Sequence, residues 1–260
     1  MSSDTISSLP SSSPIQPEIQ PEIQPQITLS TQQLDLDELN RRFETAHPLE
    51  ILSWCIANLP QGLVQTSSFG VDGMVIMDML HRRLNHPVPI LFLDTLHHFP
   101  ETLELVAKAK LRYGLDLHVY QAPVATREEF AAHYGEALWE RDVQQFHAIT
   151  KIEPLQRGLA ELNAIAWITG RRRDQSDSRA QMLIVERDAQ GRLKVNPLAT
   201  WTSKDTWRYI VEHGVLYNPL HDLGYTSIGD QPLTTAVQAG EDERAGRWRG
   251  TAKTECGIHI

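Results

Sequence analysis

The sequence predicts an α/β protein in which a twisted parallel sheet is flanked by helices. From Leu34 onward, short apolar runs of strand length alternate with longer stretches of helical length, and strands separated by helices are typical of parallel sheets. The 260 residues are 41% apolar and 22% charged, a composition that can bury the core of one or two domains.

The first half of the expected domain contains three strands. Residues 62–66 form the first predicted strand, residues 71–84 the helix after it, and residues 89–93 the second strand. The next helix is expected at 100–113, because proline costs least in the first turn of a helix. The third strand is expected at 117–120.

The second half adds a fourth strand and further helices. Acidic and aromatic stretches at 126–146 and 153–162 predict helices, and the apolar run 164–169 predicts a strand that ends at Gly170. One more helix is expected at 203–213, followed by a loop from 219 to 232.

Composition divides the chain into three parts. Residues 1–33 are rich in Ser, Pro and Gln, and an Ile-Gln-Pro-Glu repeat places a proline at every fourth position between 15 and 27. Proline at this spacing prevents a helix, so we expect a disordered extension, with a docking segment as the alternative. Residues 34–237 are expected to form the folded domain, and residues 238–260 a weakly packed, mobile tail.

Charge and composition exclude several classes of protein. The 24 basic and 33 acidic residues give a net charge of −9, which argues against a general affinity for nucleic acid. No run approaches the ~18 apolar residues of a membrane helix, and the first residues lack a secretion signal. Two cysteines, Cys55 and Cys256, are too few for a disulfide scaffold or a four-cysteine metal site. We therefore expect a cytoplasmic protein without nucleic-acid or membrane partners.

Three loops with polar side chains follow predicted strands, at 67–70, 94–95 and 170–173. Ligands of such sheets bind beyond the carboxyl ends of the strands, so we expect these loops to meet at one site. The loop 67–70 matches neither a Walker loop nor a Rossmann fingerprint. It is expected to hold an anion or a ribose hydroxyl, with a plain helix cap as the alternative. The neighbouring His97 and His98 lack a further metal ligand and are expected to be an exposed loop pair, with a nucleoside-facing role as the alternative.

Cationic residues are concentrated in two segments. The segment GRRRDQSDSR, at 170–179, contains four arginines suited to bidentate contacts with phosphate or sulfate, with a solvated charge run as the alternative. The C-terminal segment 243–260 places four more cations around Cys256, and nearby cations lower the pKa of a thiol. An incidental surface thiol is the alternative for Cys256. Cys55, in an apolar helical stretch, is expected to be an inert core residue.

Seven ordered segments together resemble the thioredoxin-dependent 3′-phosphoadenylylsulfate reductases of assimilatory sulfate reduction. They are SSFG at 67, LDTLHHFPET at 93, KIEPL at 151, GRRRDQSDSR at 170, NPLATWT at 196, YTSIGD at 225 and KTECGIH at 253. The last is the most specific, because it looks like the family's near-terminal Lys-x-Glu-Cys-Gly-Leu/Ile-His signature. The resemblance spans roughly 34–260 and implies an adenine nucleotide α-hydrolase-like fold, a sulfonucleotide-binding domain at 34–237 and a catalytic tail at 238–260.

The resemblance also implies a mechanism and a set of site residues. Cys256 attacks the sulfur of the sulfonyl group, expels adenosine 3′,5′-bisphosphate and becomes an S-sulfonate, which reduced thioredoxin, or glutaredoxin in its place, converts to sulfite. By resemblance, the residues around the phosphosulfate are Lys151, Arg179, Arg244, Arg247 and His259. Those of the nucleoside pocket are Ser67, Asp72, Leu93 and Gly170. Arg172 and Arg173 are candidate contacts of the 3′-phosphate, although the sequence does not say which of Arg171 to Arg173 points inward. A homodimer is implied, and no metal ligand is expected.

One departure from the wider family bears on the substrate. Related adenylylsulfate reductases carry a Cys-Cys pair before the Lys-x-x-Pro-Leu segment and a Cys-x-x-Cys after Ser-Ile-Gly, which together hold an iron–sulfur cluster. Here Ala148-Ile149 precede Lys151, and residues 230–233 are Asp-Gln-Pro-Leu, so no cluster is expected. The resemblance then favours 3′-phosphoadenylylsulfate, with a cluster-free adenylylsulfate reductase as the alternative.

Two interpretations from other functional classes are open. Fold relatives that adenylate or cleave pyrophosphate with ATP resemble Ser-Gly-Gly-x-Asp-Ser at the first loop, where this chain has SSFGVD at 67–72. A non-catalytic sulfonucleotide-binding protein would need an inactive tail, against which the intact Cys256 and its basic flank argue.

Overall fold

The computed structural model describes residues 31–238, 240–249, 253, 255 and 257–259. The predicted disordered extension therefore lies outside the described residues, apart from a short 3₁₀ helix at Thr31–Gln33. The Thr31 carbonyl accepts a hydrogen bond from Arg187, so contacts with the folded domain begin slightly before the predicted boundary. In this part of the chain, no helix combines the length and apolarity needed to span a membrane.

The described residues form a six-stranded sheet in the order β3-β2-β1-β4-β6-β5. Its strands are β1 (Leu63–Thr66), β2 (Ile90–Leu93), β3 (Leu117–Tyr120), β4 (Ala166–Ile168), β5 (Val185–Arg187) and β6 (Leu193–Val195). All neighbours run parallel except β5, which pairs with β6 in the antiparallel sense. The four predicted strands are confirmed. Strands β5 and β6 were not predicted, because charged residues interrupt their apolar pattern.

Nine α-helices surround this sheet in the described chain. They are α1 (Leu36–Phe43), α2 (Pro48–Asn58), α3 (Val71–Asp78), α4 (Pro100–Tyr113), α5 (Arg127–Tyr134), α6 (Leu138–Arg141), α7 (Val143–His147), α8 (Glu153–Glu161) and α9 (Ser203–His213). Helices α4 and α9 match the predictions residue for residue. The helix predicted at 71–84 is α3 continued by a π-helical turn, η2 (Met79–Arg83). The stretch at 126–146 is not one helix, because α5 ends at Gly135, whose φ of 92° interrupts the α conformation.

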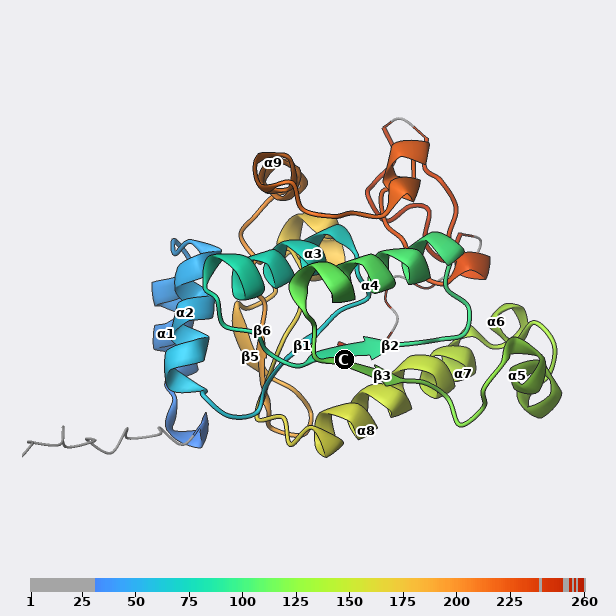
Figure 1. The fold of residues 1–260 in the computed structure, drawn as a ribbon, viewed down its shortest axis with the longest axis horizontal. Coiled ribbons are helices and arrows are strands. Elements are labelled where there is room, and N and C mark those ends of the chain that lie inside the picture. Colours follow the sequence, from blue (N-terminus) through green and yellow to red (C-terminus); the bar gives the residue numbers. More distant parts are fainter. Residues whose placement is uncertain (1–30, 239, 250–252, 254, 256, 260) are drawn as a thin grey trace, which may run out of the picture.

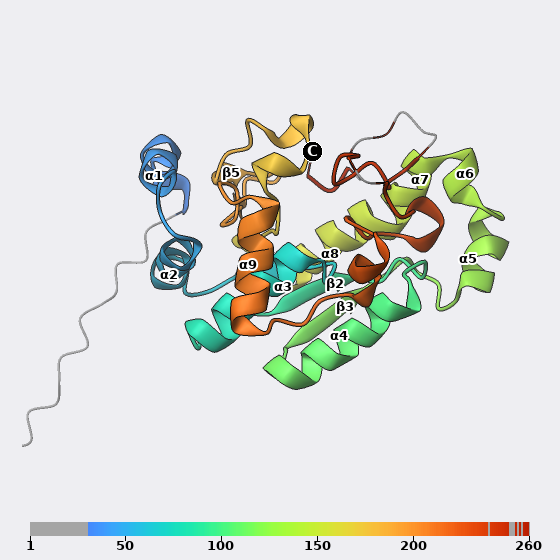
Figure 2. The same cartoon turned by 90° about the horizontal axis from the view of Figure 1, so that it is seen from above.

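The helices cover both faces of the sheet. Helices α3 and α4 lie over one face and α8 over the other (Figure 1), and α9 packs beside α3 (Figure 2). Every residue of α3 is buried, as expected for a helix enclosed between the sheet and α9. Strand β2 lies on one side of β1 and β4 lies on the other. The sheet therefore extends from β1 in both directions, and the strand order reverses there. Open α/β sheets bind ligands at such a reversal.

Two apolar residues of the tail, Trp248 and Ile258, pack against the folded domain. Trp248 is 2% exposed and belongs to an apolar cluster with Phe130 and Phe146, while Ile258 packs against a second cluster that contains Leu155 and Trp167. The expectation of weak packing is therefore wrong for these residues, because the tail inserts apolar side chains among the helices. Mobility of the tail during the reaction stays a prediction.

Candidate active site

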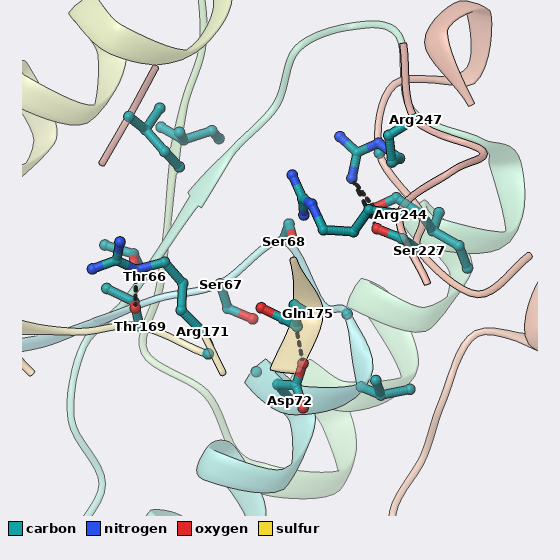
Figure 3. A pocket seen from close by; sticks show the side chains of 18 of the residues that line it. Thr66, Ser67, Ser68, Asp72, Thr169, Arg171, Gln175, Ser227, Arg244 and Arg247 are labelled. Atoms are coloured by element: carbon teal, nitrogen blue, oxygen red, sulfur yellow. Dashed lines mark hydrogen bonds between the residues drawn. The ribbon is translucent and has the colours of Figure 1, made fainter. Parts of the chain in front are cut away.

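One pocket lies beyond the carboxyl ends of β1, β2 and β4 (Figure 3). The three loops predicted to converge all contribute to its lining, through Ser67, Thr95 and Gly170. Leu93, the last residue of β2, lines it as well. The prediction that these strand ends meet at one site is confirmed, because parallel strands place their carboxyl ends along one edge of the sheet.

The loop after β1 has an unusual backbone. Phe69 has a φ of 57°, a left-handed conformation that is costly for a bulky side chain and is found mostly at functional sites. The Ser67 hydroxyl supports it by accepting a hydrogen bond from the Phe69 N–H at 3.0 Å. Helix α3 then begins after Gly70 without a side-chain cap, which leaves its first N–H groups to find other partners. This arrangement fits the expected anion or ribose site.

Gly170 allows β4 to approach the start of α3. A Cβ atom at this position would lie 2.8 Å from the Gly73 nitrogen and 3.1 Å from the Asp72 Cβ. Real Cβ atoms do not come this close to backbone atoms, so glycine is required where the two loops meet. Gly170 therefore allows the loop after β4 and the first turn of α3 to lie in contact beside the pocket.

The structure separates the three consecutive arginines that the sequence analysis left undistinguished. Arg171 lines the pocket, where its Nε donates to the Asn196 side chain at 3.2 Å. Arg173 is not among the residues that line the pocket and pairs with Glu44, the residue just after α1, at a half-exposed position. Arg172 is 1% exposed and is not part of the pocket lining.

Arg172 is instead the centre of a buried ion cluster. Its guanidinium pairs with Asp72 at 2.5 Å, Asp174 at 2.9 Å and Glu243 at 2.5 Å. Arg172 and Arg173, which were expected to contact the 3′-phosphate, therefore do not line the pocket, whereas Arg171 lines it while pairing with Glu186. Which of the three contacts the substrate stays a prediction.

Asp72 lines the pocket from the first turn of α3, but both of its carboxylate oxygens have partners. One accepts from Arg172 and from the Thr206 hydroxyl at 2.9 Å, and the other accepts from the Gln175 amide at 2.8 Å. Burial raises the pKa of Asp72, and Arg172 opposes that rise. Burial likewise raises the pKa of Glu243 to about 7.

Lys151 reaches the pocket from the π-helical turn η3 (Ala148–Ile152), where it forms an ion pair with the fully buried Asp230. His147 Nε2 lies 3.5 Å from the same carboxylate oxygen. Burial opposes ionisation of Asp230, yet Lys151 and His147 hold its pKa well below the usual range. Burial lowers the pKa of His147 to about 4, so this imidazole is neutral at pH 7.

Arg244 and Arg247 line the pocket on the side opposite to Arg171 (Figure 3). Arg247 Nη1 donates to the Ser227 hydroxyl and to the Ile228 carbonyl, both at 3.3 Å. Both guanidinium groups also lie over the Trp248 ring, at 5.2 Å for Arg244 and 4.6 Å for Arg247. Cation–π contacts of this kind orient arginine side chains toward a site.

Cys256 lies outside the described residues, but residues on both sides of it reach the pocket. Glu255 accepts two hydrogen bonds from Arg179, a pocket residue. Ile258 and His259 belong to the pocket lining. Burial lowers the pKa of His259 well below its usual range, and the surrounding cations lower it further, so the imidazole is neutral.

Most of the site residues predicted from the sequence meet in this pocket. Those that line it are Ser67, Asp72, Leu93, Lys151, Gly170, Arg179, Arg244, Arg247 and His259. Three residues of the site, Gln175, Asp230 and Glu243, were not predicted individually. Gln175 and Glu243 lie in the two cationic segments, and Asp230 ends the segment YTSIGD that carries part of the resemblance. In the described part of the chain, no group of three or more His, Cys, Asp or Glu side chains is placed to hold a metal ion.

The expectation of an exposed histidine pair is wrong. His97 is 3% and His98 is 8% exposed. His98 lines the pocket and its Nε2 lies 2.9 Å from the Leu93 carbonyl, whereas His97 packs among Phe130 and other aromatic rings. Aromatic rings from α5, α6 and α7 surround His97, which the local sequence does not reveal. His98 stacks on Phe92 of β2.

Comparison with known proteins identifies the family. Residues 62–236 match the phosphoadenosine phosphosulfate reductase domain. The phosphoadenosine phosphosulfate reductase of Emericella nidulans is 50% identical over 230 residues, which cover 86% of this chain and 74% of that protein. The chain belongs to the phosphoadenosine phosphosulfate reductase family. It is an oxidoreductase of sulfate assimilation, as the resemblance implied.

Further relatives include both nucleotide specificities. The adenosine 5′-phosphosulfate reductase of Halalkalibacterium halodurans is 42% identical, over 87% of this chain and 97% of that protein. The crystal structure of the phosphoadenylyl-sulfate reductase from Candida auris, in a phosphate complex, superposes with a TM-score of 0.71 at 40% identity, covering 78% of this chain and 96% of that one. The FMN adenylyltransferase of Candida glabrata is only 15% identical at a TM-score of 0.56 and shows a likeness of fold alone.

Proposed function

We propose that this family member reduces 3′-phosphoadenylylsulfate to sulfite and adenosine 3′,5′-bisphosphate, with Cys256 as its nucleophile. The proposal rests on one observation: a ring of cations surrounds a pocket that the residues flanking Cys256 also line. These cations are Lys151, Arg171, Arg179, Arg244 and Arg247. A pocket with five cations is suited to a substrate that carries sulfate and phosphate groups.

The first half-reaction transfers the sulfonyl group. The Cys256 thiolate attacks the sulfur, a new S–S bond forms, and the bond from sulfur to the bridging phosphate oxygen breaks. The electron pair of that bond leaves with adenosine 3′,5′-bisphosphate, and the cations stabilise the charge that develops on its phosphate. Cys256 is left as an S-sulfonate.

The second half-reaction needs a dithiol donor, for which we propose reduced thioredoxin, with glutaredoxin as the alternative. A donor thiolate attacks the Cys256 sulfur, and sulfite leaves with the electron pair of the S–S bond. The second donor thiol then resolves the mixed disulfide, so Cys256 regains its thiol and the donor becomes a disulfide. The two electrons that reduce the sulfonyl group come from this dithiol.

We assign the nucleoside to the side of the pocket formed by Ser67, Asp72, Leu93 and Gly170. Lys151, Arg171, Arg179, Arg244, Arg247 and His259 are assigned to the phosphosulfate and the 3′-phosphate. No iron–sulfur cluster takes part, because two cysteines cannot supply four thiolate ligands. The family resemblance further supports a cytoplasmic homodimer without nucleic-acid or membrane partners.

The choice of nucleotide is tested by sulfite release. The purified chain is supplied with reduced thioredoxin and, side by side, with 3′-phosphoadenylylsulfate or adenylylsulfate, and C256S is the control. Preference for the phosphorylated nucleotide, abolished in C256S, supports the proposal. Preference for adenylylsulfate would instead identify a cluster-free adenylylsulfate reductase, and release of sulfite by C256S would exclude Cys256 as the nucleophile.

A further inference from the structure

A lysine is buried in an interior strand of the sheet. Lys194 lies in β6, between β4 and β5, and its side chain is 4% exposed. A buried ammonium group is costly unless its donors have partners, and an apolar residue would be the usual choice at this position. The partners of Lys194 therefore indicate what the charge does.

Lys194 has three partners, and one of them belongs to the tail. Its Nζ lies 3.1 Å from Glu186 Oε1 on β5 and 5.4 Å from the centre of the Trp167 ring on β4. The third partner is the backbone carbonyl of His259, which accepts a hydrogen bond from Nζ at 3.2 Å. The sheet thus binds the end of the chain through a buried cation.

Trp167 completes this contact. The His259 ring stacks on the indole with 5.8 Å between centroids and 7° between planes. Ile258 packs against the apolar cluster to which Trp167 belongs. Trp167 itself is 1% exposed and is fixed by a hydrogen bond from its Nε1 to Asp188 at 3.1 Å. We call Lys194 and Trp167 together the tail anchor.

We propose that Lys194 is a positioning residue, which holds the segment after Cys256 in place for attack on the substrate. The proposal rests on the function proposed above. His259 is three residues from Cys256, a span of at most roughly 10 Å of extended chain, so fixing the His259 carbonyl restricts where the nucleophile can be. Misplacement of a reacting group by about 1 Å costs up to about 100-fold in rate.

The tail anchor is also connected to a cation of the pocket, through a shared carboxylate. Glu186 is directly opposite Lys194 in the β5–β6 register, and its Oε1 accepts from both Lys194 and the pocket residue Arg171. One carboxylate is therefore shared between the anchor of the tail and the pocket. This connection explains why a lysine, rather than an apolar residue, occupies the strand.

The rate at which carboxypeptidase Y releases His259 measures how firmly the tail anchor holds the tail. This measurement does not require the chain to be enzymatically active. K194M keeps an unbranched side chain that is one atom shorter and cannot donate, and we expect it to release His259 at least about 5-fold faster than the unmodified chain. K194R restores a donor and is expected to restore resistance. K204M is the matched control, because Lys204 is exposed on α9 and far from the tail in sequence. Equal release from K194M and the unmodified chain would overturn the proposal.

The two half-reactions supply a readout that a purely structural role would not change. In a single turnover without thioredoxin, K194M is expected to form adenosine 3′,5′-bisphosphate about 10- to 100-fold more slowly, with K194R restoring much of the rate. Reduction of a preformed S-sulfonate by thioredoxin is expected to be unchanged. Equal slowing of both half-reactions, or a lowered melting temperature with no kinetic effect, would contradict a positioning role.

I258A tests the same anchor from the tail side if K194M does not fold. It removes a contact between the tail and the core without changing the sheet, and we expect faster release of His259 and a slower first half-reaction. If the unmodified chain formed no nucleotide product, the proposed function would fail, while the carboxypeptidase comparison would still decide whether Lys194 anchors the tail.

Discussion

Arg179 and Glu255 form a two-point ion pair, in which Nε and Nη2 of the arginine donate to the two carboxylate oxygens at 2.7 and 2.8 Å. The two residues are 76 positions apart, and their side chains are only 8% and 19% exposed. Planar pairs of this kind combine strength with a fixed geometry. The residue next to Cys256 is thereby held against the turn η5 (Asp177–Arg179) at the edge of the pocket.

Removing the charge of Glu255 is expected to slow the enzyme. E255Q keeps the shape of the side chain but weakens both hydrogen bonds, so we expect kcat/KM for sulfite release to fall about 10-fold or more. D177N is the matched control, because Asp177 is an exposed acidic residue of the same turn. Steady-state kinetics with 3′-phosphoadenylylsulfate provide the measurement. Equal values for E255Q and the unmodified chain would show that the ion pair does not position the tail.

The two arginines of the run that do not line the pocket are expected to differ in their effect on stability. R172M leaves the buried Asp72 and Glu243 without their cation, which typically costs about 3 to 5 kcal/mol of unfolding free energy. R173M loses a half-exposed pair with Glu44, worth about 1 kcal/mol or less. Denaturant unfolding of both variants makes the comparison. Equal losses would place Arg172 outside the buried cluster.

Glu243 is expected to make stability depend on pH. Burial raises its pKa to about 7, against the opposing effect of Arg172, whereas the ordinary value is 4.5. Between these values the folded state holds a proton that the unfolded chain has lost, so this group's contribution to the unfolding free energy falls as pH rises from about 5 to 7. Relative to E243Q, the unmodified chain should lose stability across that range.

Unfolding free energies at pH 5, 6 and 7 test this difference. The comparison with E243Q is needed because His147, whose pKa is lowered to about 4, changes stability in the opposite direction over the same range. Parallel pH dependences in the two proteins would mean that Glu243 does not take up this proton.

The two cysteines are expected to differ in reactivity. Cys55 is fully buried in α2, and burial raises the pKa of its thiol to about 12, so it has almost no thiolate at neutral pH. Iodoacetamide should therefore label one thiol in the native protein and two after denaturation, and only the denatured C256S should be labelled. Rapid labelling of native C256S would contradict the assignment of Cys55 to the core.

Much of the fold could be predicted because its pattern is local. The four predicted strands and helices α4 and α9 follow from apolar periodicity and from signals such as Pro100 at a helix start. Strands β5 and β6 have three residues each, like β4, but they contain the charged residues Glu186, Arg187 and Lys194, so no continuous apolar run marks them. Their pairing depends on contacts with β4 and with Asn40 of α1, whose side chain bonds the backbone of residues 184 and 185.

The sequence could predict which residue types form the site, but not the directions in which their side chains point. Consecutive arginines point in different directions along an irregular chain, so the carboxylates of distant elements decide which one reaches the pocket. Glu44, just after α1, engages Arg173, and Asp72 of α3 engages Arg172. Arg171 pairs with Glu186 of β5 and is the member of the run that lines the pocket. Burial of His97 likewise depends on Phe130, Trp139 and Phe146, which are far away in the sequence.

The central claim is that Cys256 becomes a covalent S-sulfonate, and peptide mass spectrometry tests it most directly. The unmodified chain is incubated with 3′-phosphoadenylylsulfate in the absence of thioredoxin, digested without reductant and compared with C256S. We predict a C-terminal peptide heavier by one SO₃ group, which disappears when reduced thioredoxin is added and sulfite is released. Turnover to sulfite without this adduct, or an adduct on any other residue, would contradict the account.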